Sequence, residues 1–473
     1  MEHKSIWEDY SKTINNNIKP SKNIKTDILI IGGGITGLTT AYFLKDTNKK
    51  IAIIDKSLIG RGVTSKSTAK ISFLQQDIYG KLTKMHNGKI AKKYYDSQKE
   101  AINIITNIIK DNDIKCDLEK VDSVLFARKE SNYKRINKEK EILTSYGEKI
   151  KDYQDNNIKN GFSVSNTYTF NPLKYLHSLR KIIESKVSIY ENTIAAFIKK
   201  IDNSYLVTTN NGTIKTNIIV LACHYPFFII PYLFPVRTYI EREYVCAAKV
   251  KEPKKLTAIN IDKELFSIRY YKDYLIYGGI DHRLTSKIDY GNNYREIKKD
   301  FTNLFNKEPV YIWMNQDIVS NDELPLIGKI KDNIYISTAY NAWGMTNSTI
   351  GAKIVSDLIQ KKDNKYVEIF NPRRINLPLI INSIIGIFHY LKAYIEGIFH
   401  KSNPHYVKIK GIIYGVYIDR EGVEHKVKVK LICPHMKCSL VFNKEELTWD
   451  CPCHGSRFDI DGNIIETPSI KKI

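Results

Sequence analysis

The chain has 473 residues and a formal net charge of +22. This length exceeds what one hydrophobic core usually supports, so we expect two or three domains. The 73 lysines and arginines are spread along the chain, and no block of basic residues indicates a nucleic-acid partner. Residues 1–23 lack the apolar core of a signal peptide, which favours a cytoplasmic protein.

Residues 27–56 have the pattern of a dinucleotide-binding unit, which is an apolar strand, a glycine turn, a helix and a second apolar strand. Gly32, Gly34 and Gly37 follow the first strand with G-x-G-x-x-G spacing. Such glycines allow a tight turn, close approach of the backbone to a pyrophosphate, and packing of helix on strand. Asp55 ends the second strand, where an acidic side chain accepts hydrogen bonds from an adenosine ribose. The glycines alone are a weak signal, but here all four parts occur in register.

This unit, together with later segments that begin at Thr169, Val187, Ile218 and Glu323, resembles the D-amino-acid-oxidase-like family of FAD-dependent oxidoreductases. The resemblance implies an α/β, Rossmann-like FAD-binding domain interleaved with a mostly antiparallel substrate domain. It also implies a set of residues at the FAD site, which are Gly32, Gly34, Gly37, Asp55, Lys56, Thr64, Ser65, Thr68, Ala69, Lys70, Ala195, Trp343, Gly344, Met345 and Thr346.

The identity of the hydride donor is constrained by two absences from the sequence. No second G-x-G-x-x-G follows another strand, whereas flavin reductases that use NAD(P)H usually carry two such units. This favours an organic substrate. Relatives that oxidise amino acids usually hold the substrate carboxylate with an arginine, but the segment before "LPLIG" has Gln316 and no arginine. The weak catalytic candidates are Arg269, which could instead be an interdomain arginine, and His224, which could instead be a satisfied histidine at a strand end.

The C-terminal region contains Cys433-x-His435 and, after fifteen intervening residues, Cys451-x-x-His454. Two cysteines and two histidines can hold a tetrahedral zinc ion. A zinc site would leave the two further cysteines of this region without a role. This counts against zinc, but the residue types alone do not settle which metal centre is present.

The same pattern, followed by Gly455 and Ser456, resembles the Rieske iron–sulfur family, which forms a small all-β domain. In that family two thiolates bind one iron of a [2Fe-2S] cluster and two imidazoles bind the other. The resemblance implies Cys433, His435, Cys451 and His454 as iron ligands and a disulfide between Cys438 and Cys453. High-potential relatives have a hydrogen-bonding Tyr where this chain has Phe458. We therefore expect a potential below the top of the range of about −150 to +300 mV.

Residues 377–399 are the most apolar later stretch, although Asn382, His389, Lys392 and Glu396 interrupt it. Its apolar residues recur at helical spacing, at Ile380, Ile384, Phe388, Leu391, Ile395 and Ile398. This pattern predicts a one-sided helix docked as a linker, and not a transmembrane segment. A helix lying on a membrane surface is the alternative.

The predicted domains follow from these patterns. We expect a lead segment (1–26), an FAD-dependent oxidoreductase (27–370), a helical linker (371–404) and a Rieske domain (405–473). Within the oxidoreductase we expect flavin segments at about 27–95, 165–225 and 323–362, and a substrate domain at about 96–164 and 226–322.

These features predict an FAD-dependent oxidoreductase, a dehydrogenase more than an oxidase. A small organic substrate, an amine or amino-acid derivative, would give a hydride to the flavin. Electrons would then pass singly to the [2Fe-2S] cluster and on to an external acceptor, a carrier protein or a quinone. The alternative is a flavin and iron–sulfur electron-transfer protein without a small-molecule substrate.

Overall fold

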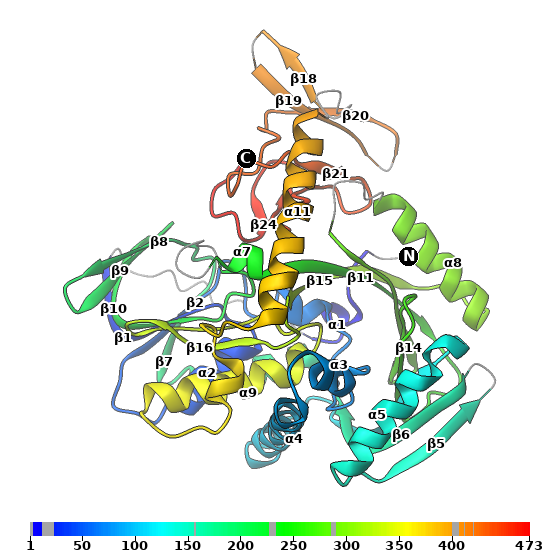
Figure 1. Cartoon of the computed structure of the whole chain (residues 1–473). Coiled ribbons are helices and arrows are strands. Elements are labelled where there is room, and N and C mark those ends of the chain that lie inside the picture. Colours follow the sequence, from blue (N-terminus) through cyan, green and yellow to red (C-terminus); the bar gives the residue numbers. More distant parts are fainter. Residues whose placement is uncertain are drawn as a thin grey trace.

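The computed structural model describes residues 3–11, 23–155, 158–226, 233–284, 290–399, 406–410, 412–419 and 421–473. Two large sheets stand side by side, and a smaller β domain sits above them at the C-terminal end of a long helix (Figure 1). This arrangement confirms the predicted fold class, a mixed flavin fold followed by a small all-β domain.

The first large sheet has the strand order β16-β17-β10-β1-β2-β7, with β9 on β10 and β8 on β9. The pairs β1–β2, β1–β10 and β10–β17 are parallel. The four residues at the C-terminal end of β1 are buried, as expected for a parallel sheet covered on both faces. Its strands are β1 (Asn23–Ile31), β2 (Ile51–Ile54), β7 (Val187–Tyr190), β8 (Ala195–Ile201), β9 (Ser204–Thr209), β10 (Gly212–Leu221), β16 (Leu326–Lys331) and β17 (Ile334–Thr338).

The second large sheet has the order β15-β11-β14-β13-β12-β4-β6-β3, with β5 on β6. All pairs are antiparallel except β12–β4. Its strands are β3 (Lys70–Ile71), β4 (Glu119–Ala127), β5 (Ile150–Asp155), β6 (Ile158–Thr169), β11 (Thr238–Lys249), β12 (Leu256–Asn260), β13 (Phe266–Tyr271), β14 (Tyr274–Arg283) and β15 (Tyr311–Ser320).

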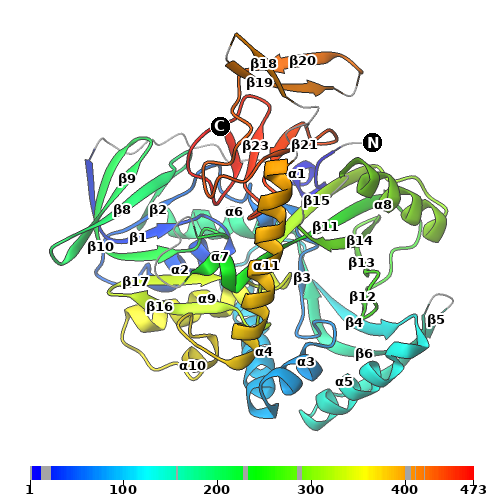
Figure 2. The same ribbon diagram turned by 45° about the horizontal axis from the view of Figure 1, so that its top comes forward.

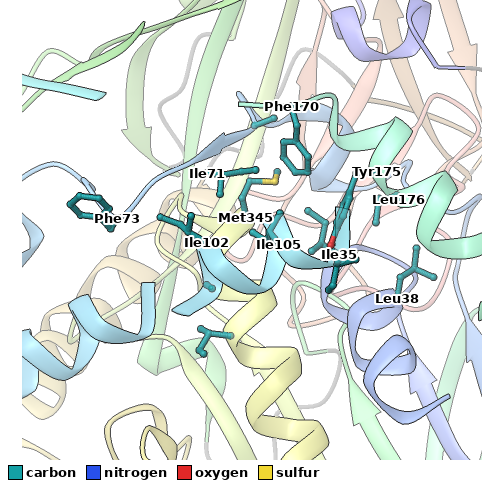
Figure 3. Close-up of a cluster of buried hydrophobic side chains, with 14 of the residues drawn as sticks. Ile35, Leu38, Ile71, Phe73, Ile102, Ile105, Phe170, Tyr175, Leu176 and Met345 are labelled. Carbon is teal, nitrogen blue, oxygen red and sulfur yellow. The ribbon is translucent and has the colours of Figure 1, made fainter. Parts of the chain in front are cut away.

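Helices cover both sheets and join them. Figure 3 shows apolar side chains from several of these helices meeting around Met345, which forms a core shared by the flavin helices and strand β3. The predicted boundary between residues 95 and 96 falls inside α4, which packs on α9. The helices are α1 (Ile6–Asp9), α2 (Ile35–Leu44), α3 (Ile78–Met85), α4 (Gly88–Asp111), α5 (Tyr133–Ser145), α6 (Pro172–Ile183), α7 (Phe234–Arg237), α8 (Tyr290–Phe305), α9 (Gly344–Ile359) and α10 (Val367–Phe370), with 3₁₀ turns η1 (Val63–Lys66) and η2 (Glu130–Asn132).

The C-terminal domain consists of two small antiparallel sheets (Figure 2). Trp449 and Phe458, both fully buried, lie in its core. One sheet contains β18 (Tyr406–Ile409), β19 (Ile412–Ile418) and β20 (Glu424–Val427), and the other contains β21 (Val441–Asn443), β22 (Thr448–Asp450), β23 (Arg457–Asp459) and β24 (Ile464–Glu466).

Helix α11 (Leu377–Phe399) runs along the outside of the molecule towards the β18–β20 sheet (Figures 1 and 2). The predicted helix is confirmed and it is docked, but not through the apolar stripe seen in the sequence. Leu379 and Gly386 are buried on the docked side. The stripe instead faces outwards, with side chains 45–68% exposed at Ile380, Ile384, Phe388, Leu391 and Ile395. Ile398 lies outside the described side chains.

Candidate functional site

A cavity of about 870 Å³ opens between the two large sheets and reaches the C-terminal domain. It is lined by β1, β2, the loop after β2, the N-terminus of α9 and one face of the second sheet. Every residue predicted to contact FAD lines this cavity except Gly37 and Thr346. Thr346 instead accepts a hydrogen bond from Gln75 (3.1 Å), so its hydroxyl points into the α4–α9 packing.

The glycine turn has the shape that a dinucleotide requires. Gly32 has φ +113°, and a Cβ there would lie 2.3 Å from the Ala222 carbonyl oxygen. A Cβ on Gly37 would lie 1.9 Å from the Gly32 oxygen, so Gly37 serves the packing of α2 and not the cavity. Asp55 accepts hydrogen bonds from the amides of Gly33 (2.7 Å) and Ser57 (2.8 Å). These contacts fix the turn around an open space that fits the diphosphate of FAD.

The N-terminus of α9 points into the same cavity. Trp343 caps the helix, and Gly344 and Met345 line the cavity beside it. The positive end of the helix dipole therefore faces the region where a flavin ring would lie. This arrangement fits stabilisation of negative charge on a reduced ring.

Four carboxylates line the cavity on the second sheet, and we call them the acidic wall: Glu241, Glu243, Asp281 and Asp317. Burial, followed by the neighbouring carboxylates, raises the pKa of Glu241 to about 7. Burial likewise raises the pKa of Asp317 to about 7, and that of Glu243 to about 8 despite nearby Lys70. In the part of the chain that the structure describes, none of the four forms an ion pair within 4 Å.

Asn315 lies beside the acidic wall on β15 and also lines the cavity. Its Nδ2 donates to Asp317 (2.7 Å), but its Oδ1 is buried and has no partner among the described residues. Lys70 donates to the Ser267 hydroxyl, and burial lowers its pKa to about 8. The cavity therefore presents unsatisfied acceptors, which favour a ligand with hydrogen-bond donors and positive charge.

The structure does not support Arg269 as a substrate clamp. Its guanidinium donates to the carbonyl oxygens of Thr68 and Ala69 (both 2.8 Å) and lies over the Trp7 ring, 5.0 Å from its centroid. Arg269 does not line the cavity, because the backbone of the cofactor loop takes up its donors. It is the interdomain arginine of the competing interpretation.

His224 does line the cavity. Its φ is 52°, its backbone oxygen accepts from Thr338, and burial lowers its pKa to about 4. Its Nε2 is buried without a partner among the described residues. His224 is thus a neutral imidazole at the cavity edge, and its catalytic role stays a prediction.

The four predicted iron ligands converge from two loops of the C-terminal domain. The rings of His435 and His454 lie 5.0 Å apart and perpendicular. Both nitrogens of His435 and Nδ1 of His454 are buried without hydrogen-bond partners in the described structure. The thiol of Cys451 hydrogen-bonds the sulfur of Cys433, which lowers the pKa of Cys433 to about 7. Two thiols and two unsatisfied imidazoles at one point fit the donor set of a [2Fe-2S] cluster.

The two loops are joined as predicted. Cys438 and Cys453 form a disulfide with a Cα–Cα distance of 6.5 Å, and their sulfurs lie within 4.8 Å of the Cys451 sulfur. The amide of Ser469 donates to the Ser456 hydroxyl (2.9 Å). Phe458 is fully buried in β23 and brings no hydroxyl towards the ligand loops.

The ligand His454 faces the rest of the molecule. Its ring stacks on Tyr390 of α11, with centroids 4.7 Å apart and planes at 25°, and Tyr225 of the flavin domain approaches its edge. Tyr390 is held by a hydrogen bond from its hydroxyl to the Thr238 carbonyl oxygen (2.7 Å). His454 is 3% exposed, whereas His435 is only half-buried. One imidazole thus points inwards and the other lies nearer the surface.

A buried charge network, which we call the interface network, joins the C-terminal domain to the second sheet. Arg242 of β11 donates to Asp450 (2.9 Å) and to Gln316 (2.9 Å), and Gln316 donates to the Gly455 carbonyl oxygen (3.0 Å) beside the ligand loop. Residues 464–467 of the C-terminal domain line the flavin cavity itself.

Arg457 is the centre of the interface network. It is 1% exposed and forms ion pairs with Asp450 (3.1 Å), Glu466 (3.2 Å) and Glu446. Glu466 also pairs with Lys66 of the cofactor loop (3.2 Å). Burial acts to raise the pKa of Glu466, but Lys66 and Arg457 hold that pKa well below its usual value.

Comparison with known proteins identifies the family of each of the two parts of the chain. Residues 27–358 match the FAD dependent oxidoreductase family, and residues 398–473 match the Rieske [2Fe-2S] domain. The chain therefore belongs to the FAD-dependent oxidoreductases and carries a C-terminal Rieske domain, which confirms FAD and a [2Fe-2S] cluster as its cofactors and sets the zinc alternative aside.

Individual relatives match one or both of these parts. The Rieske 2Fe-2S iron-sulfur protein YhfW of Bacillus subtilis is 31% identical over 477 residues, covering 96% of this chain and 93% of that protein. Gamma-glutamylputrescine oxidoreductase of Escherichia coli is 21% identical, covering 72% of this chain and 85% of the relative. The crystal structure of glycine oxidase from Geobacillus kaustophilus has the same fold over 75% of this chain and all of its own, with TM-score 0.62 and 15% identity.

The acidic wall and Asn315 were missed by the sequence reasoning, although a signal was present. Residues two apart in a strand share a face, so "ERE" places Glu241 and Glu243 on one side of β11 and Arg242 on the other. The same alternation in "NQD" places Asn315 and Asp317 towards the cavity. Gln316, the position considered for a substrate arginine, therefore faces the Rieske loop.

Proposed function

We propose that this protein oxidises a small cationic amine at FAD and passes the electrons one at a time through its Rieske cluster to an external acceptor. The observation that carries the proposal is a single cavity with three kinds of wall. The cofactor loop, the acidic wall and residues 464–467 of the Rieske domain all line it. An electron-transfer protein without a small substrate would have no need of unmatched buried carboxylates.

The acidic wall supports an amine in preference to an amino acid. Unpaired buried carboxylates are costly unless a cation neutralises them. The cavity lacks an arginine that could clamp a substrate carboxylate among its described lining, apart from Arg61 in the loop after β2. A ligand carboxylate would be repelled by Glu241, Glu243 and Asp317. One relative is also named for a putrescine derivative, gamma-glutamylputrescine.

The residues of this chain can perform the polar part of the reaction. When bound, FAD supplies a hydride acceptor and the [2Fe-2S] cluster supplies a one-electron relay. Glu243 and the Asn315 Oδ1 are placed to accept hydrogen bonds from an ammonium group. Glu241, with a pKa of about 7, can take the proton that the ammonium must lose before its carbon is oxidised.

Reduction of the holoprotein by candidate substrates tests the proposal. A four-carbon diamine, n-butylamine and glycine would each be mixed anaerobically with the protein, and the visible and EPR spectra recorded. We expect the amines to bleach the flavin bands and generate the reduced-cluster signal, with the diamine fastest and glycine inactive. Bleaching by glycine alone would refute the amine class. Reduction only by a protein electron carrier would instead support the electron-transfer alternative.

A further inference from the structure

The outer side of α11 is an exposed apolar surface that neither cofactor site uses. Leu377 is 69% exposed and Phe388 is 68% exposed. Further large apolar side chains lie along the same helix with 40–51% exposure, at Ile380, Ile381, Ile384, Ile385, Ile387, Leu391, Tyr394 and Ile395. At a rise of about 1.5 Å per residue the stripe from Leu377 to Ile395 is about 27 Å long. Contiguous apolar surface of this kind marks an interaction site.

The orientation of this helix is fixed by specific contacts on its inner side. Arg374 and Asp322 form a bidentate ion pair just before the helix, with distances of 2.6 and 2.7 Å. Asn382 donates to the Asn321 carbonyl oxygen (2.7 Å), and Tyr390 donates to the Thr238 carbonyl oxygen. The apolar stripe therefore faces outwards because polar anchors hold the opposite side against the protein.

The segment that follows the helix is basic. Residues 401–437 contain seven lysines and one arginine against three acidic residues. The described lysines of this segment, Lys408, Lys410, Lys426, Lys428, Lys430 and Lys437, are exposed. Apolar side chains are exposed among them at Val407, Ile409 and Ile418. Lys392 is the one charged side chain of α11 that the structure describes, and it is also exposed.

We propose that α11 docks this protein on the surface of an anionic lipid membrane, with its outer apolar side buried among the headgroups and the lysines of residues 408–437 against the lipid phosphates. No helix of the described chain is long and apolar enough to cross a membrane. A one-sided apolar helix with adjacent lysines has the features of a helix that lies in the membrane plane. A second copy is disfavoured as the occupant, because each chain carries a net charge of +22 and like charges repel.

The docking helix also contacts the iron–sulfur site. Tyr390 stacks on His454 from the inner side of α11, within one helical turn of Phe388 and Leu391 on the outer side. Membrane contact would therefore hold the Rieske domain at the lipid surface. The proposal does not depend on which substrate the flavin cavity accepts.

Vesicle flotation of the holoprotein tests the docking surface. We expect the wild type to float with vesicles of phosphatidylglycerol and phosphatidylcholine, and to bind pure phosphatidylcholine and high-salt samples more weakly. The double substitution Ile384→Glu with Phe388→Glu should weaken binding about tenfold or more, because two apolar side chains are replaced by anions. Phe197→Glu is the matched control, since Phe197 is 63% exposed on β8, away from α11, and should leave binding unchanged.

Two results would overturn the proposal. The first is a wild type that stays with the unbound fraction at all lipid compositions, or a double variant that floats like the wild type. The second is sedimentation of the lipid-free wild type as a dimer that the double variant converts to a monomer, because a second copy would then cover the stripe. The visible spectrum of the cluster, unchanged in the double variant, shows that the variant has folded.

Discussion

Buried charges lie on both sides of the paired strands β11 and β15, and the charges on the Rieske side differ from those on the cavity side in their partners. On the Rieske face, Arg242 pairs with Asp450, and Arg457 pairs with Asp450, Glu446 and Glu466. On the cavity face, Glu241, Glu243 and Asp317 have no arginine partner among the described residues. The pKa values of the two sets move in opposite directions accordingly.

The difference separates a charge cluster that holds domains together from one that is prepared for a ligand. Burial disfavours a carboxylate in both places. At Asp450 burial is outweighed by Arg457 and Arg242, which hold its pKa below the usual value. At Glu241 nothing outweighs it, and neighbouring carboxylates raise the pKa further. An incoming cation would supply the missing charge.

Arg457→Met should have the largest effect, because it removes the cation shared by Asp450, Glu446 and Glu466. Breaking a buried pair of this kind costs about 3–5 kcal/mol of unfolding free energy. Urea unfolding followed by the cluster absorbance measures it. Lys408→Met, an exposed lysine in the same domain, should change stability by less than about 0.5 kcal/mol. Equal losses of unfolding free energy in the two variants would show that the buried ion pairs of Arg457 stabilise the protein no more than the exposed charge of Lys408.

Glu241→Gln and Glu243→Gln should act on binding and not on stability. Each removes a charged hydrogen-bond acceptor for the ligand, which corresponds to about a 10- to 100-fold loss of affinity for a cationic amine. Unfolding free energy should stay the same or rise, since a costly buried carboxylate becomes neutral. Glu252→Gln, at an exposed position, is the control. A loss of stability without a loss of affinity would show that the wall is structural.

The two faces should also respond to different ranges of pH. Burial raises the pKa of Glu241 and of Asp317 to about 7, so these groups ionise as pH rises through neutrality. The affinity for a permanently charged trimethylammonium ligand should rise about tenfold from pH 6 to pH 8. Titration calorimetry at several pH values measures it, and a flat profile would contradict the wall as the binding site.

In the interface network the carboxylate pKa is shifted in the opposite direction, downwards. The folded-state pKa of Glu466 is depressed, so its contribution is present above the ordinary glutamate value of about 4.3 and is lost as pH falls through the folded value. Domain association should therefore be constant from pH 6 to pH 8 and weaken only below about pH 4. Limited proteolysis between the domains across this range checks the prediction.

Gln316→Leu should have the smallest effect. It removes the hydrogen bonds from Gln316 to Gly455 and from Arg242 to Gln316, which is worth about 1 kcal/mol of unfolding free energy. Amine affinity should not change, because Gln316 faces the Rieske loop. A large loss of amine affinity would mean that the two faces are coupled through the strand.

Much of the site could be predicted because local patterns carry it. The glycine turn at Gly32 and the pairs Cys433-x-His435 and Cys451-x-x-His454 lie within short stretches whose spacing is set by the chemistry of their ligands. The orientation of α11 could not be predicted in this way. An apolar stripe indicates a helix face, but only the polar contacts of Asn382 and Tyr390 decide that the stripe faces outwards. The structural role of Arg269 could not be predicted from local patterns either, because its partners are carbonyl oxygens about 200 residues earlier.

The amino-acid sequence by itself determined the two cofactor domains and their order, and its resemblance to the Rieske family implied the disulfide between the ligand loops. The motifs of the two domains depend on residue type and close spacing, which a chain carries whatever its tertiary fold. The tertiary structure alone decided that the Rieske domain lines the flavin cavity and that Arg242 and Glu243, adjacent residues of β11, serve opposite sides of the sheet. The physical reason is that a strand alternates its side chains, and what each face meets depends on elements distant in the sequence.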